Sequence, residues 1–156
     1  MAKIINLFIF LSTMTLYVCC NGLSLNPHNV CNIDINFISE LRRSYGINHI
    51  RTRLDYYEVF YENNKKLYIS LNKNNFYFEN YMSTMDSLEI QSIVNVLDIC
   101  NEFEVKNLSI DKNHYFSMNE GGTYIYQVDI NEPIALEPSE KGKIVNIKDK
   151  WFYYKP

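Results

Sequence analysis

The feature that most constrains the fold is a series of short runs, rich in aromatic and β-branched residues, separated by polar turns. Residues 56–61, 67–71 and 76–78 are such runs, and residues 62–65 and 72–75 connect them. Aromatic and β-branched side chains fit the half-buried surface of a pleated sheet. Strands joined by so few residues pair antiparallel, because a parallel pair needs a long crossover. The pattern therefore predicts an antiparallel meander.

The rest of the chain repeats this pattern on both sides of the meander. Apolar and charged residues alternate over 50–55, which predicts a strand that precedes it. The polar stretch 131–142 contains Pro133 and Pro138 and is predicted to be a long surface loop. Further strands are predicted at 105–110, 115–118, 123–130, 144–147 and 151–154.

Two segments have helical periodicity. Asp34 is a candidate cap for a helix over 35–45 that ends at Gly46. A second helix, capped by Ser83 or Thr84, runs to about residue 101. Its apolar stripe consists of Ile90, Ile93, Val94, Leu97 and Cys100. The order helix, strands, helix, strands predicts an α+β fold, with two helices on one face of a mostly antiparallel sheet.

The N-terminus predicts export. Lys3 precedes a mostly apolar stretch, residues 4–18, which is shorter than the roughly 20 residues that span a bilayer. We interpret residues 1–20 as a signal segment, 21–31 as a polar tether and 32–156 as a single domain. An uncleaved membrane anchor and a buried N-terminal element are the alternatives. The predicted location is secreted, periplasmic or anchored to a membrane and facing outward, with membrane contact only through the leader or a lipid.

The four cysteines form two pairs, for which we make different predictions. Cys19 or Cys20 is a candidate for lipidation, although Tyr17 and Val18 stand where a bacterial lipoprotein signal has small residues. Cys31 and Cys100 remain in the exported domain, where an oxidising compartment favours a disulfide. The alternative is that Cys100 is a small buried hydrophobic residue.

The C-terminal part of the chain ends in a Trp- and Tyr-rich strand, Lys-Asp-Lys-Trp-Phe-Tyr-Tyr over residues 148–154. Together with the helix and strands before it, this ending resembles small exported bacterial proteins of uncharacterised function. The resemblance covers residues 84–156. It implies the order of helix, strands and terminal strand, and it brings no catalytic residues.

Few residues of the sequence point to a catalytic, metal or cofactor site. His28, His49 and His114 are scattered, so the sequence predicts no metal site. No Gly-x-Ser-x-Gly motif is present, and Gly121-Gly122 lies in a predicted hairpin rather than in a phosphate-binding loop. We predict no cofactor and no catalytic residue. A net charge of −3 without a basic cluster argues against a nucleic-acid partner.

The aromatic residues of the strands are the candidate binding surface. Tyrosine and tryptophan supply contact area at low entropic cost, which suits a protein or glycan ligand. The alternative is that outward tyrosines stabilise the sheet through cross-strand pairs. The candidates are Tyr57, Tyr124, Tyr126, Trp151 and Tyr153.

These observations predict an exported, non-enzymatic binding or interaction domain. One alternative is a small hydrolase-type enzyme built on scattered carboxylates, for which the candidates are Glu58, Glu62, Glu79 and Glu102. A structural component of the cell envelope is the other alternative.

Overall fold

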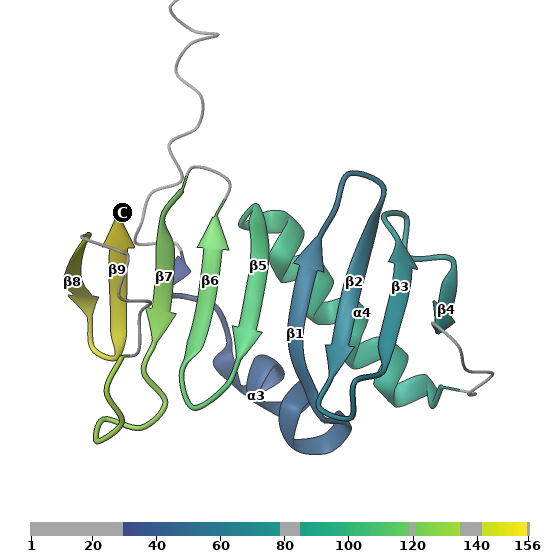
Figure 1. Cartoon of the computed structure of the whole chain (residues 1–156), viewed down its shortest axis with the longest axis horizontal. Coiled ribbons are helices and arrows are strands. Elements are labelled where there is room, and N and C mark those ends of the chain that lie inside the picture. The colour runs from purple at the N-terminus through teal and green to yellow at the C-terminus, as the bar shows by residue number, and fades with distance from the viewer. Residues whose placement is uncertain (1–29, 79–84, 119–120, 135–141, 156) are drawn as a thin grey trace, which may run out of the picture.

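A computed structural model describes residues 30–78, 85–118, 121–134 and 142–155. Its elements, labelled as in Figure 1, include both helices and strands, so the fold is α+β and dominated by sheet. They are α3 (Ile35–Tyr45), β1 (Ile47–Thr52), β2 (Tyr56–Tyr61), β3 (Lys66–Ser70), β4 (Phe76–Phe78), α4 (Ser87–Glu102), β5 (Val105–Ile110), β6 (His114–Met118), β7 (Thr123–Tyr126), β8 (Lys143–Lys148) and β9 (Trp151–Lys155).

The strands form one nine-stranded sheet in the order β4-β3-β2-β1-β5-β6-β7-β9-β8. Every neighbouring pair is antiparallel. Helix α4 returns the chain from the edge strand β4 to the middle of the sheet, where β5 pairs with β1. Figure 1 shows α3 and α4 behind the sheet. Neither helix covers the face toward the viewer, which we call the open face.

Local side chains fix the start of each helix. The Asp34 side chain accepts a hydrogen bond from the Asn36 backbone N–H at 2.9 Å, as predicted for a cap at this position. Helix α4 begins later than predicted, because Asp86 is its cap and accepts from the Leu88 N–H at 3.3 Å. The earlier candidates, residues 83 and 84, lie outside the described residues.

The core lies between the two helices and the sheet. Ile50, Val59 and Leu67 are neighbours in the strand register, and each is at most 1% exposed. Val30 and Ile33, which precede α3, are buried in the same core. The buried residues of the helices are Ile38 and Leu41 of α3 and Ile93, Val96, Leu97 and Cys100 of α4.

Arg42 joins α3 to two turns of the sheet. Its Nε donates to Glu62 Oε1 at 2.9 Å, just after β2. Its Nη1 donates to Asp111 Oδ1 at 2.6 Å and to the Ile110 carbonyl at 3.2 Å, at the end of β5. A planar guanidinium presents several donors in a fixed fork, so one side chain can set the orientation of the helix against both turns.

The sheet is open, with β4 and β8 at its edges. Strand β8 pairs with β9 on one side, and most of its residues are exposed. Ile144 and Val145 are exposed apolar residues of this strand, which begins at Lys143 and ends at Lys148. An unpaired strand edge presents backbone donors and acceptors to its surroundings.

Within the described residues, neither helix has the length and apolar character needed to cross a bilayer. The predicted signal segment, residues 1–20, lies outside the described part of the chain, together with Cys19 and Cys20. Export and lipidation therefore remain predictions.

Candidate functional site on the open face of the sheet

The aromatic residues proposed as a binding surface lie on the core side of the sheet. Tyr57, Tyr124 and Trp151 are buried at 2%, 7% and 4% exposure, and Tyr126 and Tyr153 pack against the core. Neighbouring side chains of a strand point to opposite faces of the sheet. Choosing the wrong member of a Tyr-Tyr pair as the outward one therefore places the predicted binding surface on the wrong face. These five side chains therefore do not form an exposed surface.

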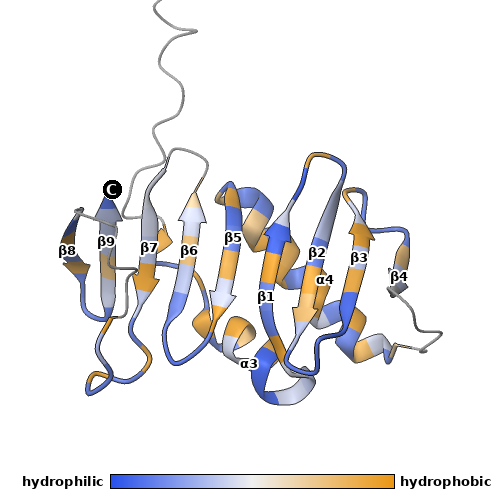
Figure 2. Cartoon of the chain, viewed as in Figure 1, coloured by the Kyte–Doolittle hydropathy of each residue, from blue (hydrophilic) through white to orange (hydrophobic). Residues whose placement is uncertain are grey.

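A different set of side chains occupies the open face. The register aligns Tyr77, Tyr68, Glu58, Arg51 and Asn107 in one row from β4 to β5. This row points away from the helices, because its members alternate along the strands with buried core residues. Figure 2 shows hydrophilic segments at the two ends of β1 and at the start of β3, on either side of hydrophobic stretches.

The other end of the open face is less accessible. Ile125 of β7 and Tyr154 of β9 belong to this face by register, yet they are 0% and 2% exposed. The Tyr154 hydroxyl accepts a hydrogen bond from the Gly142 N–H at 3.1 Å. The accessible part of the open face therefore lies toward β1, β2 and β3.

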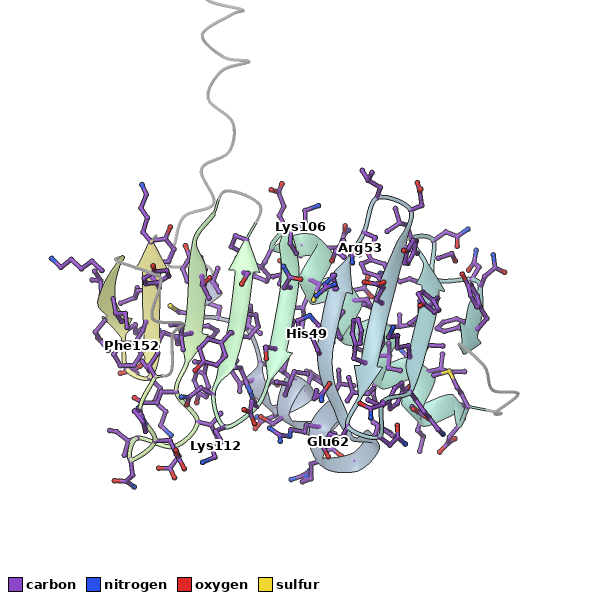
Figure 3. The ribbon with its side chains drawn as sticks, in the orientation of Figure 1. His49, Arg53, Glu62, Lys106, Lys112 and Phe152 are labelled. Atoms are coloured by element: carbon purple, nitrogen blue, oxygen red, sulfur yellow. The ribbon has the colours of Figure 1, made fainter. Side chains whose placement is uncertain are left out.

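An open hollow of about 410 Å³ lies where β1, β2, β3 and the β2–β3 turn meet. Among the described residues, its lining consists of three cationic side chains, one histidine, two asparagines and two aromatic residues. Figure 3 labels His49 of β1 in the middle of the sheet, and Arg53 just beyond the upper end of β1. The lining residues are Asn48, His49, Arg51, Phe60, Tyr61, Asn64, Lys65 and Lys66.

Phe60 organises the charges of the hollow. The Arg51 guanidinium carbon and the Lys66 ammonium nitrogen each lie 5.7 Å from the centroid of its ring. The His49 ring meets the same ring edge-on at 5.4 Å between centroids. Cations are attracted to the face of an aromatic ring at this separation, so Phe60 holds two positive charges near one apolar surface.

The carboxylates nearest to this hollow along β2 are already bound to arginines. Glu58 accepts from Arg53 Nε at 2.8 Å and lies 3.8 Å from Arg51 Nη1. Glu62 is paired with Arg42 at 2.9 Å. Glu58 thus shares the charges of Arg51 and Arg53, and Glu62 shares the charge of Arg42.

His49 adds an uncharged nitrogen to this environment. Its Nε2 is buried, and no hydrogen-bond partner for it is present among the described residues. Burial lowers the pKa of His49, the positive charge of Arg51 lowers it further, and Glu58 opposes both. The imidazole is therefore neutral at pH 7, when one ring nitrogen can donate and the other can accept a hydrogen bond.

A second pair of polar side chains lies on the core side. Ser39 Oγ of α3 is 3.0 Å from His114 Nε2 of β6, the spacing of a nucleophile and its base. His114 is only 3% exposed, and its Nδ1 has no hydrogen-bond partner among the described residues. Asp111, an acid close to His114 along the chain, is bound to Arg42. In the part of the chain that the structure describes, the pair has no orienting acid, and it joins α3 to the sheet.

The structure does not form the predicted disulfide, because Cys31 and Cys100 are free thiols. Cys31 is half-buried and Cys100 is buried. Burial raises the pKa of Cys100 to about 12, as expected for a core thiol.

The carboxylates proposed for a hydrolase are not brought together in the described residues. Glu58 and Glu62 are bound to arginines, and Glu102 is exposed at the end of α4. Glu79 lies outside the described residues. In the part of the chain that the structure describes, no group of three or more His, Cys, Asp or Glu side chains could hold a metal ion.

Sequence reasoning predicted a strand that contains Arg51 and Arg53 but did not identify a site there. The signal available was the alternation of residues 50–55 together with Lys65 and Lys66, which follow the turn after the second predicted strand. Comparisons with protein-family models, curated proteins and solved structures found no match for this chain.

Proposed function

We propose that this chain is an exported, non-enzymatic binding domain that holds an anionic group of a protein or glycan ligand on its open face. The observation that carries the proposal is the hollow, which brings the cationic side chains of Arg51, Lys65 and Lys66 together in one open space. A hydrogen bond between a cationic donor and an anion is roughly twice as strong as one between neutral groups. The adjacent amides of Asn48 and Asn64 add neutral donors at the rim.

Binding is favoured over catalysis by the state of the candidate catalytic groups. The Ser39–His114 pair is on the core side and lacks an acid partner among the described residues. Glu58 and Glu62 are held by arginines, so neither is placed as a general acid or base. The hollow, in contrast, offers donors without a nucleophile–base pair.

The proposal is tested by titrating the isotopically labelled protein with sodium sulfate at constant ionic strength, with sodium chloride as the reference. Amide signals of Asn48, His49 and Lys66 should shift with sulfate, and Lys66→Gln should remove the effect. Lys112→Gln is the matched control, because Lys112 is exposed at the β5–β6 turn and pairs with Glu132 at 2.8 Å. Shifts spread evenly over the surface, or unchanged by Lys66→Gln, would contradict the proposal.

The export part of the proposal has its own test. Intact-mass spectrometry of the protein from its native host should show loss of about twenty residues, the length of a signal segment. A mass that begins at Cys19 or Cys20 with an added lipid would instead establish membrane tethering. An intact Met1 would contradict a cleaved leader.

A further inference from the structure

The edge of the sheet at β8 carries backbone hydrogen-bonding groups that the fold does not use. Strand β8 pairs with β9 on one side, and no described strand lies on its other side. Every second residue of such a strand directs its N–H and C=O outward. Figure 1 shows β8 at the end of the sheet, with neither α3 nor α4 behind β8 and β9. An extended segment of another chain can therefore pair with β8 from outside.

The two lysines of β8 lie on the same face of the sheet. In a regular strand Lys143 and Lys148 would point to opposite faces, because they are five residues apart. The pairing with β9 shifts between Asn146 and Lys148, so that Lys148 lies opposite the buried Trp151. Lys143 lies opposite Lys155, which is on the same face of β9 as Trp151. Both lysines of β8 therefore lie on the helix side, beyond the area that the helices cover.

Between these lysines, β8 is apolar and exposed. Val145, on the same face as the lysines, is 46% exposed, and Ile144, on the opposite face, is 39% exposed. Within the described residues, no ion pair joins Lys143 or Lys148 to a carboxylate. Residues 143–155 contain four lysines and one aspartate, in a chain whose net charge is −3. The edge therefore has positive charge at both ends and apolar side chains between them.

We propose that β8 binds an extended acidic segment of a partner protein, which joins the sheet as a further antiparallel strand. In such an addition, backbone hydrogen bonds supply affinity and alternate side chains supply specificity. A segment that follows β8 in the register of β9 has its first and fifth residues opposite Lys148 and Lys143. These two residues are acidic, and the third and fourth, opposite Val145 and Ile144, are apolar. The proposal goes beyond the anion site and does not depend on the hollow.

The test uses the short peptide acetyl-Thr-Glu-Thr-Val-Val-Glu-Thr-amide, titrated into the purified, isotopically labelled protein. Amide signals of residues 144–147 should shift, and hydrogen exchange of β8 should slow. A peptide of the same composition whose two glutamates are adjacent should bind several-fold more weakly, because only one glutamate can then face a lysine. Binding should also weaken as the salt concentration rises, since exposed charges are screened.

Methylation of the peptide backbone separates strand pairing from simple attraction between charges. Alternate N–H groups of a strand point to opposite sides within the plane of the sheet. Methylation of the set that faces β8 should abolish the shifts, whereas methylation of the other set should leave them unchanged. Equal binding of the parent peptide and both methylated forms would overturn the addition of a strand.

Substitution of the two lysines tests the acidic character of the partner. The double variant Lys143→Gln and Lys148→Gln should bind the peptide about tenfold more weakly, because two exposed ion pairs are lost. Lys112→Gln is the matched control, since Lys112 pairs with Glu132 away from β8. Thermal unfolding establishes that each variant is folded. The double variant Lys143→Glu and Lys148→Glu should instead prefer a peptide with lysines in place of both glutamates.

Each contrary result has a distinct meaning. Absence of shifts at residues 144–147 would overturn the docking edge, and unchanged affinity in the double glutamine variant would overturn the acidic partner. A dimer of the free protein whose formation shifts the same signals would assign the edge to a second copy. Sulfate tests the hollow through the signals of Asn48 and His49 on β1, so the failure of either proposal is recognised separately from the other.

Discussion

His114 should make this protein sensitive to mild acid. Its imidazole is 3% exposed, hydrogen-bonds Ser39 at 3.0 Å and stacks against Tyr126 at 6.4 Å between ring centroids. Burial lowers the pKa of His114 from 6.5 to about 4. The charge of Arg42 acts in the same direction, whereas the Asn113 backbone and Asp111 oppose it more weakly than burial.

Acid lowers the stability of the fold because His114 takes up a proton on unfolding. The unfolded chain binds a proton at His114 near pH 6.5, whereas the folded chain does so only near pH 4. The contribution of neutral His114 to stability is therefore complete above about pH 6.5 and is lost progressively as the pH falls toward 4. A pKa difference of this size between the folded and unfolded chain corresponds to roughly 3 kcal/mol of unfolding free energy. About 2 kcal/mol of it is lost between pH 7 and pH 5.

The assay is urea unfolding of the wild type and of His114→Gln at pH 7 and pH 5. Gln keeps an acceptor for Ser39 and does not titrate, while the carboxylates are common to both proteins. Between pH 7 and pH 5, the unfolding free energy of the wild type should fall by about 2 kcal/mol more than that of the variant. This corresponds to a difference of about 1 M in the shift of the urea midpoint. His49→Gln is the histidine control. Equal losses in the wild type and His114→Gln would refute the reasoning, as would an NMR titration of the His114 ring near pH 6.5 in the folded protein.

Three further outcomes follow from the packing. Arg42→Met should lower the unfolding free energy by about 1 kcal/mol, measured by urea titration, because it keeps the aliphatic stem and removes partly exposed ion pairs. Gly122→Ala should cost about 1 to 3 kcal/mol, since a Cβ there would lie 2.6 Å from a Tyr153 ring carbon. The loss of unfolding free energy caused by Gly122→Ala should be smaller in a Tyr153→Leu background. Equal losses with Tyr153 and with Leu at this position would contradict the contact. A thiol reagent should label half-buried Cys31 in the folded protein but buried Cys100 only after denaturation, whereas a urea midpoint that falls on reduction would indicate a disulfide.

The local signals in the sequence predicted the elements well. The polar turns 62–65 and 72–75 and the capping Asp34 stand where they were expected, because turns and caps depend on residues close in the chain. Strand β7 is shorter than predicted and ends at Tyr126. Helix α4 buries Val96, which the predicted stripe omitted, because its facing depends on how it packs against the sheet.

The site could not be predicted, because it depends on which face of the sheet the helices cover. In the pair Tyr56-Tyr57, hydrophobicity is the same for both residues, so nothing local assigns Tyr57 to the core and Tyr56 to the open face. The contacts of Phe60 with Arg51 and Lys66 join three strands and require the register of the sheet. The Ser39–His114 bond joins residues that are 75 apart in the chain.

The exposed edge of β8 bears on how this protein behaves at high concentration. When two copies of this strand approach antiparallel and in register, Lys143 of one copy lies opposite Lys148 of the other at both ends of the new pair. Like charges placed directly opposite each other are destabilising, so the terminal lysines oppose stacking of one sheet onto the next. The apolar Ile144 and Val145 between them would otherwise favour such contact. We therefore expect the two lysines to lower the tendency of the β8 edge to pair with a second copy.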